Sequence, residues 1–264
     1  MSPETYDRRR FRTAAPYYAQ YRLGYPQALI AKVIDLVGLE AGDTVLDLGC
    51  GPGTLAIPFA AHGMRVMAID PEPEMLKAAR QAAEEAGVDV DIREGSSFDM
   101  PSGIGPFRLV TMGRSFHWME RTATLTILDR LMTDDGAVAH FDDEHPKTVE
   151  NRWRGLLRDL GNKYGREESP HVLDTARPEY RNHVSILLDS PFSRLEHYGV
   201  FARREITPDD IVGLAYSLST SAPQRLGDRR EEFERELRSG LALLSPEGRF
   251  TEIAEVSALI ARRP

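Results

Sequence analysis

Cysteine is almost absent from this chain, and no apolar run is long enough to cross a membrane. Cys50 is the one cysteine among 264 residues, so an internal disulfide and the Cys-x-x-Cys spacing of structural zinc sites are excluded. Residues 1–12 are polar and rich in arginine, and no apolar run approaches the ~20 residues that span a bilayer. We therefore expect a protein of the reducing cytoplasm with no membrane partner.

Positive charge is also in short supply. The chain has 33 Lys and Arg residues against 41 Asp and Glu residues, a formal net charge of −8, and it lacks a long Lys/Arg run. Binding to a phosphate backbone normally needs a basic surface, so nucleic acid is a disfavoured partner. The hydrophobic content of 41% is enough for a substantial core. The length allows one large domain or a domain with an added cap.

Strand and helix patterns alternate through the first half of the chain. Short apolar or β-branched runs predict strands, and longer amphipathic runs between them predict helices. The predicted strands are 44–48, 65–69, 88–93, 107–112 and 137–142, and the predicted helices are 27–37, 54–62, 73–86 and 121–132. This alternation indicates a parallel sheet with right-handed crossovers and a ligand crevice at the carboxyl ends of the strands.

The second half follows a different pattern. Helices are expected at 149–164, 178–189, 209–219 and 229–244, with a last strand at 250–260. Residues 195–206 predict a strand pair or one strand interrupted at Gly199.

A glycine-rich turn follows the first predicted strand. Gly49, Gly51 and Gly53 stand in the sequence VLDLGCGPGT, where the lack of a Cβ lets the backbone approach a ligand. Seventeen residues after Gly53, the second strand ends in Asp70, where a carboxylate can accept both hydroxyl protons of a ribose. Turn and acid together predict a ligand that contains adenosine.

The acid before the turn decides between the adenosine ligands. A dinucleotide fingerprint requires glycine where this chain has Thr54, and Asp47 would repel a pyrophosphate. An acid there suits S-adenosylmethionine, which carries a sulfonium and an ammonium group and no phosphate. Residues 44–143 resemble the cofactor half of the class I S-adenosylmethionine-dependent methyltransferases, and LDLGCGPG is a specific signal of that family.

The resemblance implies a role for each matching position, and it implies S-adenosylhomocysteine as the product. Asp47 and the backbone of the three glycines would hold the methionine end, and Asp70 the ribose. Pro71 and Met75 would flank the adenine. Many relatives place Asp where this chain has Ser96, so the adenine amino group would be bound by Ser96 itself or by one of its neighbours, Ser97, Phe98 or a backbone carbonyl.

Two further segments resemble a subgroup of small-molecule methyltransferases near the trans-aconitate-type enzymes. In GRSFHWMER (113–121), His117 is a candidate general base, Trp118 a candidate pocket wall and Arg114 a candidate cofactor residue. The alternative is that Phe116 and Trp118 only pack and that His117 bonds a backbone group.

The N-terminal stretch YAQYRLGYP (18–26) would lie over the cofactor. Tyr17, Tyr18, Tyr21 and Arg22 are its candidates, since a ring can face the sulfonium and a guanidinium can pair with the cofactor carboxylate. The alternative is an ordinary amphipathic lid helix without a ligand contact.

Two further regions bear on whether the protein binds a metal and on which methyl acceptor it selects. The sequence HFDDEH (140–145) offers metal ligands, but alternate residues of a strand face opposite ways, so solvated strand-end acids are favoured and no metal is predicted. Residues 145–190 are expected to form a helical cap that selects the acceptor. An inward-facing arginine there would favour a carboxylic acid. The candidates are Arg152, Trp153, Arg154, Tyr164, Arg177 and Tyr180.

These observations predict one α/β domain with a Rossmann-like, seven-stranded, mostly parallel sheet whose last strand is antiparallel. Residues 1–43 would form a lid and first helix, 44–143 the cofactor core, 145–190 the cap, and 191–264 the strands and helices that complete the sheet. The predicted function is methyl transfer to a small molecule, with carboxylate or hydroxyl oxygen favoured. A nucleic-acid or protein methyltransferase, or a non-catalytic protein that binds the cofactor, is the alternative.

Overall fold

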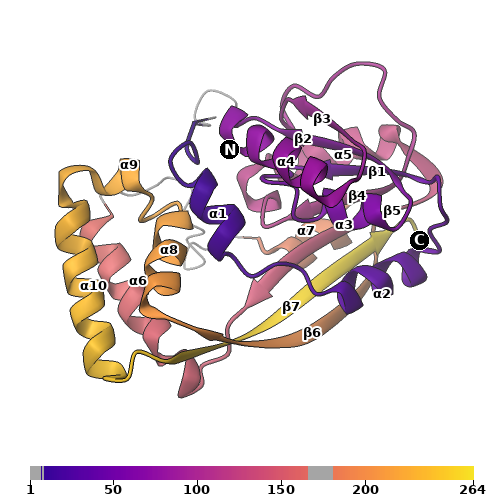
Figure 1. The fold of residues 1–264 in the computed structure, drawn as a ribbon. Helices are drawn as coiled ribbons and strands as arrows, with labels where there is room; N and C mark the ends of the chain where they lie inside the picture. Colours follow the sequence, from indigo (N-terminus) through magenta and orange to yellow (C-terminus); the bar gives the residue numbers. More distant parts are fainter. Residues whose placement is uncertain (1–6, 8, 166–180) are drawn as a thin grey trace.

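A seven-stranded sheet forms the centre of the described part of the chain (Figure 1). The computed structural model describes residue 7, residues 9–165 and residues 181–264. The strand order is β3-β2-β1-β4-β5-β7-β6, in which β1 to β5 run parallel and β7 runs antiparallel to both β5 and β6. The strands are β1 Thr44–Leu48, β2 Arg65–Asp70, β3 Val90–Glu94, β4 Phe107–Gly113, β5 Met132–Glu144, β6 Arg194–Ile206 and β7 Phe250–Arg262. The predicted Rossmann-like fold class is confirmed.

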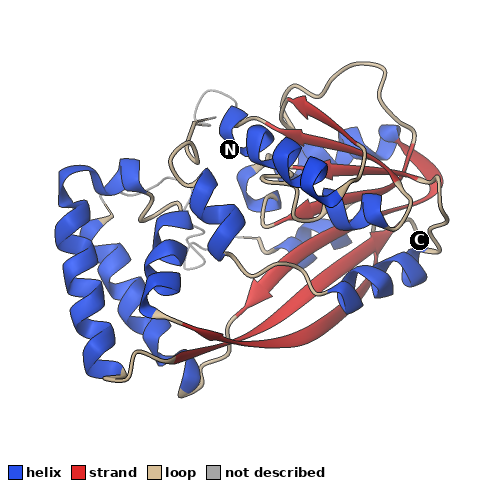
Figure 2. Cartoon of the chain, in the orientation of Figure 1, coloured by secondary structure: helices blue, strands red, loops and turns tan. Residues whose placement is uncertain are grey.

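Helices cover both faces of this sheet (Figure 2). On one face lie α2 Gln27–Val37, α3 Ala56–Ala61 and α4 Pro73–Ala86, and on the other lie α5 Arg121–Leu131 and α7 His183–Leu188. Strand β1 shows why both faces are needed. Val45 packs on the α2 side while Leu46 and Leu48 pack on the α5 side, as expected of a parallel strand buried on both faces.

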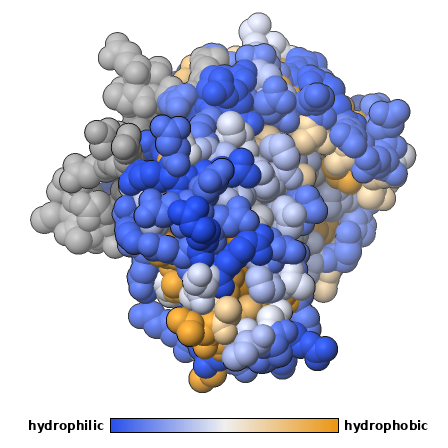
Figure 3. Space-filling view, turned by 60° about the vertical axis from the view of Figure 1, so that its left-hand side comes forward, coloured by the Kyte–Doolittle hydropathy of each residue, from blue (hydrophilic) through white to orange (hydrophobic). Residues whose placement is uncertain are grey.

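A bundle of helices lies beyond one end of the sheet. It contains α1 Ala15–Tyr21, α6 Trp153–Tyr164, α8 Pro208–Ser217, α9 Pro223–Leu226 and α10 Arg230–Leu244. Its core is formed by Trp153, Leu157, Ile211, Phe233 and Leu237, all of which are buried. Strands β5, β6 and β7 of the sheet reach this bundle at one end (Figure 1). The face of the molecule that carries the bundle is largely hydrophilic (Figure 3).

The bundle comes only in part from the segment predicted as the cap, 145–190. Helix α6 lies inside that segment, whereas α8, α9 and α10 come from the segment between β6 and β7. Helix α7, which also lies inside 145–190, packs on the sheet through Ile186 and Leu187. An amphipathic pattern predicts a buried stripe without saying which apolar surface covers it. Arg177 and Tyr180 lie outside the described residues.

Strand β6 is continuous, so a strand pair at 195–206 is the wrong alternative. Gly199 pairs with Ser257 inside the β6–β7 ladder, and a Cβ at Gly199 would collide with the carboxylate of Glu255. This glycine therefore marks a close side-chain approach and not a turn. None of the described helices is long and apolar enough to span a membrane.

The contact of α1 with α8 gives a stability prediction. A Cβ at Gly213 would overlap the ring of Tyr21, so Gly213→Ala must displace one helix and should lower the free energy of unfolding by about 1–3 kcal/mol. Chemical denaturation measures this change. The matched control is Gly155→Ala in α6, where a Cβ meets nothing within 4 Å and the exchange should stabilise by up to about 1 kcal/mol. Equal effects of the two exchanges would contradict the packing argument.

Candidate active site

The loop between β1 and α3 depends on its glycines. Gly49, Gly51 and Gly53 have φ of 73°, 53° and 83°, a region that side chains with a Cβ rarely adopt. A Cβ at Gly49 would also lie 2.6 Å from the Cβ of Ser115. The backbone N–H groups of Gly49 and Cys50 both donate to the Ile69 carbonyl, at 2.8 and 3.0 Å. The loop is therefore held against the end of β2.

Asp70, at the end of β2, joins this loop to the start of α4. Its Oδ2 accepts from the backbone N–H of Gly51, and its Oδ1 accepts from the backbone N–H of Glu72, each at 2.9 Å. Burial raises the pKa of Asp70 to about 6, while the two backbone hydrogen bonds lower it. A carboxylate oxygen has room for a second hydrogen bond, so both oxygens remain able to accept from a ligand.

Loop and acid lie on the wall of one partly open pocket. The structure brings ten of the sequence-predicted cofactor residues together here. They are Tyr18, Gly49, Gly51, Asp70, Pro71, Met75, Ser96, Ser97, Phe98 and Arg114. Trp118, the predicted pocket wall, also lines this pocket.

Six other lining residues were not predicted individually, although four of them belong to the motifs LDLGCGPG and GRSFHWMER. They are Phe11, Leu48, Glu72, Gly113, Ser115 and Met119. Phe11 reaches the pocket by packing edge-on against Trp118, with ring centroids 5.8 Å apart. Glu72 is the buried N-cap of α4, and its carboxylate accepts from the Glu74 N–H at 3.3 Å. The Pro73 that follows it is typical of the first position of a helix and is the sequence feature that indicates this cap.

Asp47 is not among the residues that line the pocket, so its contact with the methionine end stays a prediction. Its Oδ2 accepts from the Ala56 N–H at 3.0 Å, and its Oδ1 accepts from the Thr111 hydroxyl at 2.9 Å. Burial raises the pKa of Asp47 to about 7. Gly53 is likewise outside the lining, and a Cβ there would lie 3.1 Å from Ile57. Both residues position the loop from behind.

The N-terminal helix α1 turns only some of its candidates to the pocket. Tyr18 lines it, whereas Tyr17 and Tyr21, one turn apart, face α8. Arg22 stacks on the ring of Tyr18 at 4.8 Å and donates to the Ser217 hydroxyl at 2.9 Å. Tyr21 and Arg22 are therefore not pocket residues, because α8 occupies the side of α1 from which they extend.

His117 lies just behind the pocket wall. It belongs to the 3-10 helix η2 Phe116–Trp118, and its ring is 4.7 Å from that of Trp118, which does line the pocket. Burial lowers the pKa of His117 to about 4, and His140, Arg22 and Arg121 lower it further against the charge of Asp142. His117 is thus a neutral imidazole at neutral pH, the form that accepts a proton.

The acids at the end of β5 differ in exposure, because Asp143 is largely buried whereas Asp142 is half-exposed and Glu144 is exposed. Asp143 pairs with Arg114 at 2.6 Å and with His145 at 3.5 Å, and Asp142 lies 3.7 Å from His140. Arg114 directly follows β4 and Asp143 belongs to β5, so the sheet brings this ion pair together. Among the described residues, no group of three or more His, Cys, Asp or Glu side chains is arranged to hold a metal ion.

Comparisons with known proteins agree with this geometry. Residues 45–136 match the family model described as a methyltransferase domain. An uncharacterized methyltransferase of Mycobacterium tuberculosis (strain ATCC 25618 / H37Rv) is 25% identical over 209 residues, which cover 79% of this chain and 76% of that protein.

Solved structures share the fold. One from Anaeromyxobacter dehalogenans, described as a candidate type II methyltransferase, is similar with a TM-score of 0.62 and 20% identity, over 92% of this chain and 98% of that chain. An S-adenosylmethionine-dependent methyltransferase from Thiobacillus denitrificans, solved with S-adenosyl-L-homocysteine, is similar with a TM-score of 0.52 and 16% identity, over 96% and 98% of the two chains.

Sheet order, glycine loop and acid-lined pocket define a Rossmann-like methyltransferase. Residues 45–136 form a methyltransferase domain, and the chain is an S-adenosylmethionine-dependent methyltransferase. Its pocket fits that cofactor, because a buried carboxylate at the end of β2 faces the same cavity as the glycine backbone, the ring of Tyr18 and the apolar side chains of Met75 and Phe98.

The buried carboxylate of Asp47 predicts a pH effect on stability. Its raised pKa means that ionisation costs more in the folded state, so its contribution to stability falls as pH rises from about 4 to about 7. Asp47→Asn lacks this titration and can keep both hydrogen bonds. The stability of the variant relative to the wild type should therefore rise over this range, by at most about 4 kcal/mol.

Denaturation at several pH values measures this difference. The control is Asp228→Asn, which changes an exposed acid. Its stability relative to the wild type should stay level between pH 4 and 7 in the same experiment. A level difference for Asp47→Asn would show that its carboxyl titrates normally.

Proposed function

We propose that this methyltransferase acts on a small molecule, preferentially on a carboxylate or hydroxyl oxygen. The observation that carries the proposal is the covered state of the cofactor pocket, since Phe11 and Tyr18 from the N-terminal segment line it together with Trp118. Such a cover leaves little room for a folded protein or a duplex as acceptor. The negative net charge and the likeness of residues 113–121 to trans-aconitate-type enzymes support the same proposal.

Different residues of the pocket would bind different parts of the cofactor. Asp70 would accept the ribose hydroxyl protons, and the backbone of Gly49 and Gly51 would lie along the methionine end. Met75 and Phe98 would enclose the adenine. Ser96 stands where an acid binds the adenine amino group in many relatives, and its hydroxyl bonds Asp99, which brings a carboxylate to that position indirectly.

Arg114 and Tyr18 complete the methionine end. Arg114 lines the pocket while Asp143 and the Leu23 carbonyl, 2.6 Å from its Nη2, hold the guanidinium in place, so it can face the cofactor carboxylate. The ring of Tyr18 can face the sulfonium. Tyr21, Arg22, Asp47 and Gly53 would act on the cofactor only through the residues that they position.

When bound, S-adenosylmethionine supplies an electrophilic methyl group, and the acceptor oxygen forms the new C–O bond as the C–S bond breaks and its electron pair stays on sulfur. The protein contributes orientation and exclusion of water. A carboxylate acceptor has no proton to lose. A hydroxyl acceptor must lose one, and neutral His117 behind Trp118 is the base that would receive it.

Asp70 provides the direct test of cofactor binding. In Asp70→Asn the amide nitrogen would face the N–H of Gly51 or of Glu72, so the affinity for S-adenosylmethionine should fall about ten- to a hundredfold. Titration calorimetry measures this, and tritium transfer from labelled cofactor into small-molecule and macromolecular fractions locates the acceptor. Asp228→Asn is the control for charge. Label in protein or nucleic acid alone would refute the small-molecule proposal, and cofactor binding without transfer would refute catalysis.

His117 is tested by its dependence on the acceptor. With a hydroxyl acceptor, His117→Asn should lower kcat by about 10²- to 10⁴-fold and leave the cofactor affinity unchanged, because His117 is outside the pocket lining. With a carboxylate acceptor kcat should stay the same. Its low pKa predicts a rate that is level above about pH 5 and falls toward pH 4. The control is His62→Asn, an exposed histidine at the end of α3. Equal losses with both acceptors would contradict a role as base.

A further inference from the structure

A second cavity lies at the junction of the sheet and the helical bundle, outside the cofactor pocket. It is bounded by the segment between β5 and α6, by α6 itself and by the segment after α8. Lys147, Arg152, Arg154, Arg158 and His145 are among its lining residues, and no carboxylate is found among the lining residues described. The mostly acidic chain thus concentrates basic side chains at one hollow.

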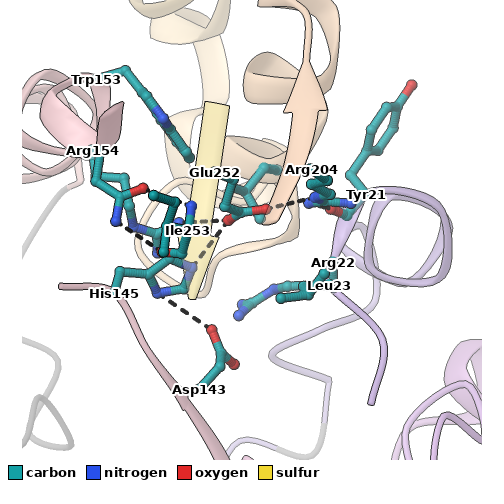
Figure 4. Close-up of polar contacts among 12 residues, drawn as sticks. Tyr21, Arg22, Leu23, Asp143, His145, Trp153, Arg154, Arg204, Glu252 and Ile253 are labelled. Carbon is teal, nitrogen blue, oxygen red and sulfur yellow. Dashed lines mark hydrogen bonds and ion pairs between the residues drawn. The ribbon is translucent and has the colours of Figure 1, made fainter. Parts of the chain in front are cut away.

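Arg154 is the basic residue of this cavity whose guanidinium is held by Glu252 and Trp153. Its Nη1 donates to Oε1 of Glu252 at 2.9 Å, and its guanidinium lies 5.1 Å from the ring centroid of Trp153 (Figure 4). One carboxylate oxygen therefore engages one arm of the guanidinium. An arginine held in this way presents a fixed donor face to the cavity, which lowers the entropy lost on binding an oxyanion.

Glu252 cannot neutralise the cations around it. This buried carboxylate is shared by Arg154, by Arg204 at 2.6 Å and by His145 at 3.0 Å. Although burial raises it, the hydrogen bond from His145 and the charges of Arg204 and Arg154 lower the pKa of Glu252 to about 2. Glu252 is fully ionised at neutral pH and still carries one charge against two arginines.

The ion network continues to the cofactor pocket, and positive charge is in excess along this part as well. His145 contacts Asp143 at 3.5 Å, and Asp143 pairs with Arg114, which lines that pocket. In total, three arginines and one histidine share the two carboxylates Glu252 and Asp143. The network is therefore net positive even when the histidine is neutral.

Arg22 adds a further positive charge beside this network. Figure 4 shows its side chain extending from the N-terminal segment toward the space between Asp143 and Arg204. Its hydrogen bonds go to the hydroxyl and carbonyl of Ser217, and no carboxylate of the described residues lies within ion-pair distance of it. Burial lowers the pKa of Arg154, and the charges of Arg22 and Arg204 lower it further. Partly buried positive charge of this kind is stabilised by an anion.

We propose that this cavity is an anion-binding site centred on Arg154, with Lys147 as an additional donor, and that it takes a ligand bearing a carboxylate or phosphate group. The anionic group belongs either to the methyl acceptor or to a separate small anion. In the first case the site defines the acceptor as an acid, and this part rests on the proposed function. In either case the Arg154–Glu252–His145–Asp143–Arg114 network connects the site to the cofactor pocket.

Calorimetry with malonate and with inorganic phosphate tests the site directly. Saturable binding is expected for the wild type, and Arg154→Gln and Lys147→Gln should each weaken it about tenfold or more. The matched control is Arg203→Gln, which removes the same charge from an exposed position next to Arg204 and should leave binding unchanged. Thermal unfolding checks that Arg154→Gln is folded. If it is not, Lys147→Gln decides, because Lys147 is exposed and no ion pair holds it among the described residues.

Absence of binding to the wild type, or equal weakening by Arg203→Gln, would overturn the proposal. A second arm measures methyl transfer to hydroxy acids and to their primary amides. If the anion is part of the acceptor, the amides should have KM values about tenfold higher or more, and Arg154→Gln should remove the preference. Equal transfer to both, with malonate binding that depends on Arg154, assigns the site to a separate anion. Failure to bind S-adenosylmethionine would refute the proposed function and leave the malonate result standing.

Discussion

The cofactor site of this enzyme depends on two buried carboxylates that hold one glycine loop from opposite sides. Asp47 bonds the start of α3 and the β4 side chain of Thr111, and Asp70 bonds Gly51 and the start of α4. Each carboxylate replaces its hydration with two hydrogen bonds inside the protein, and each has a raised pKa because burial is only partly offset. These bonds hold the loop from both sides, and of the two carboxylates only Asp70 lines the pocket.

The three long strands β5, β6 and β7 connect the cofactor half of the sheet to the helical bundle. They carry Asp143, Arg204 and Glu252 beyond the part of the sheet that the helices cover, so the ion network forms where the sheet meets α6. The same network includes Arg114 of the cofactor pocket. Side chains of neighbouring strands thus connect the pocket lined by Arg114 with the cavity lined by Arg154.

Local patterns predicted the first half of the fold well, and the second half only as separate elements. Residues 27–37 form the expected helix α2, and the strands up to β5 appear where they were expected, because β1, β2 and β4 are each followed by a helix that covers the sheet. Helices α8 and α10 were expected near their observed positions, but α8 packs on α1 and α10 packs on α6, and each of these partners is more than sixty residues away in the chain. Nothing in a single amphipathic stripe specifies such a partner.

The sequence by itself determined the glycine loop, the acid at the end of β2 and the methyltransferase class, since glycine conformation and strand order are local properties. Tertiary structure alone decided which candidates line the pocket. Asp47 and Gly53 turn behind the loop, and Arg22 turns from the pocket toward α8, because neighbouring elements occupy the space on one side of each. It also joined Glu252 to Arg154 across ninety-eight positions of sequence, since ion pairs form between side chains that the sheet and the bundle bring within hydrogen-bonding distance.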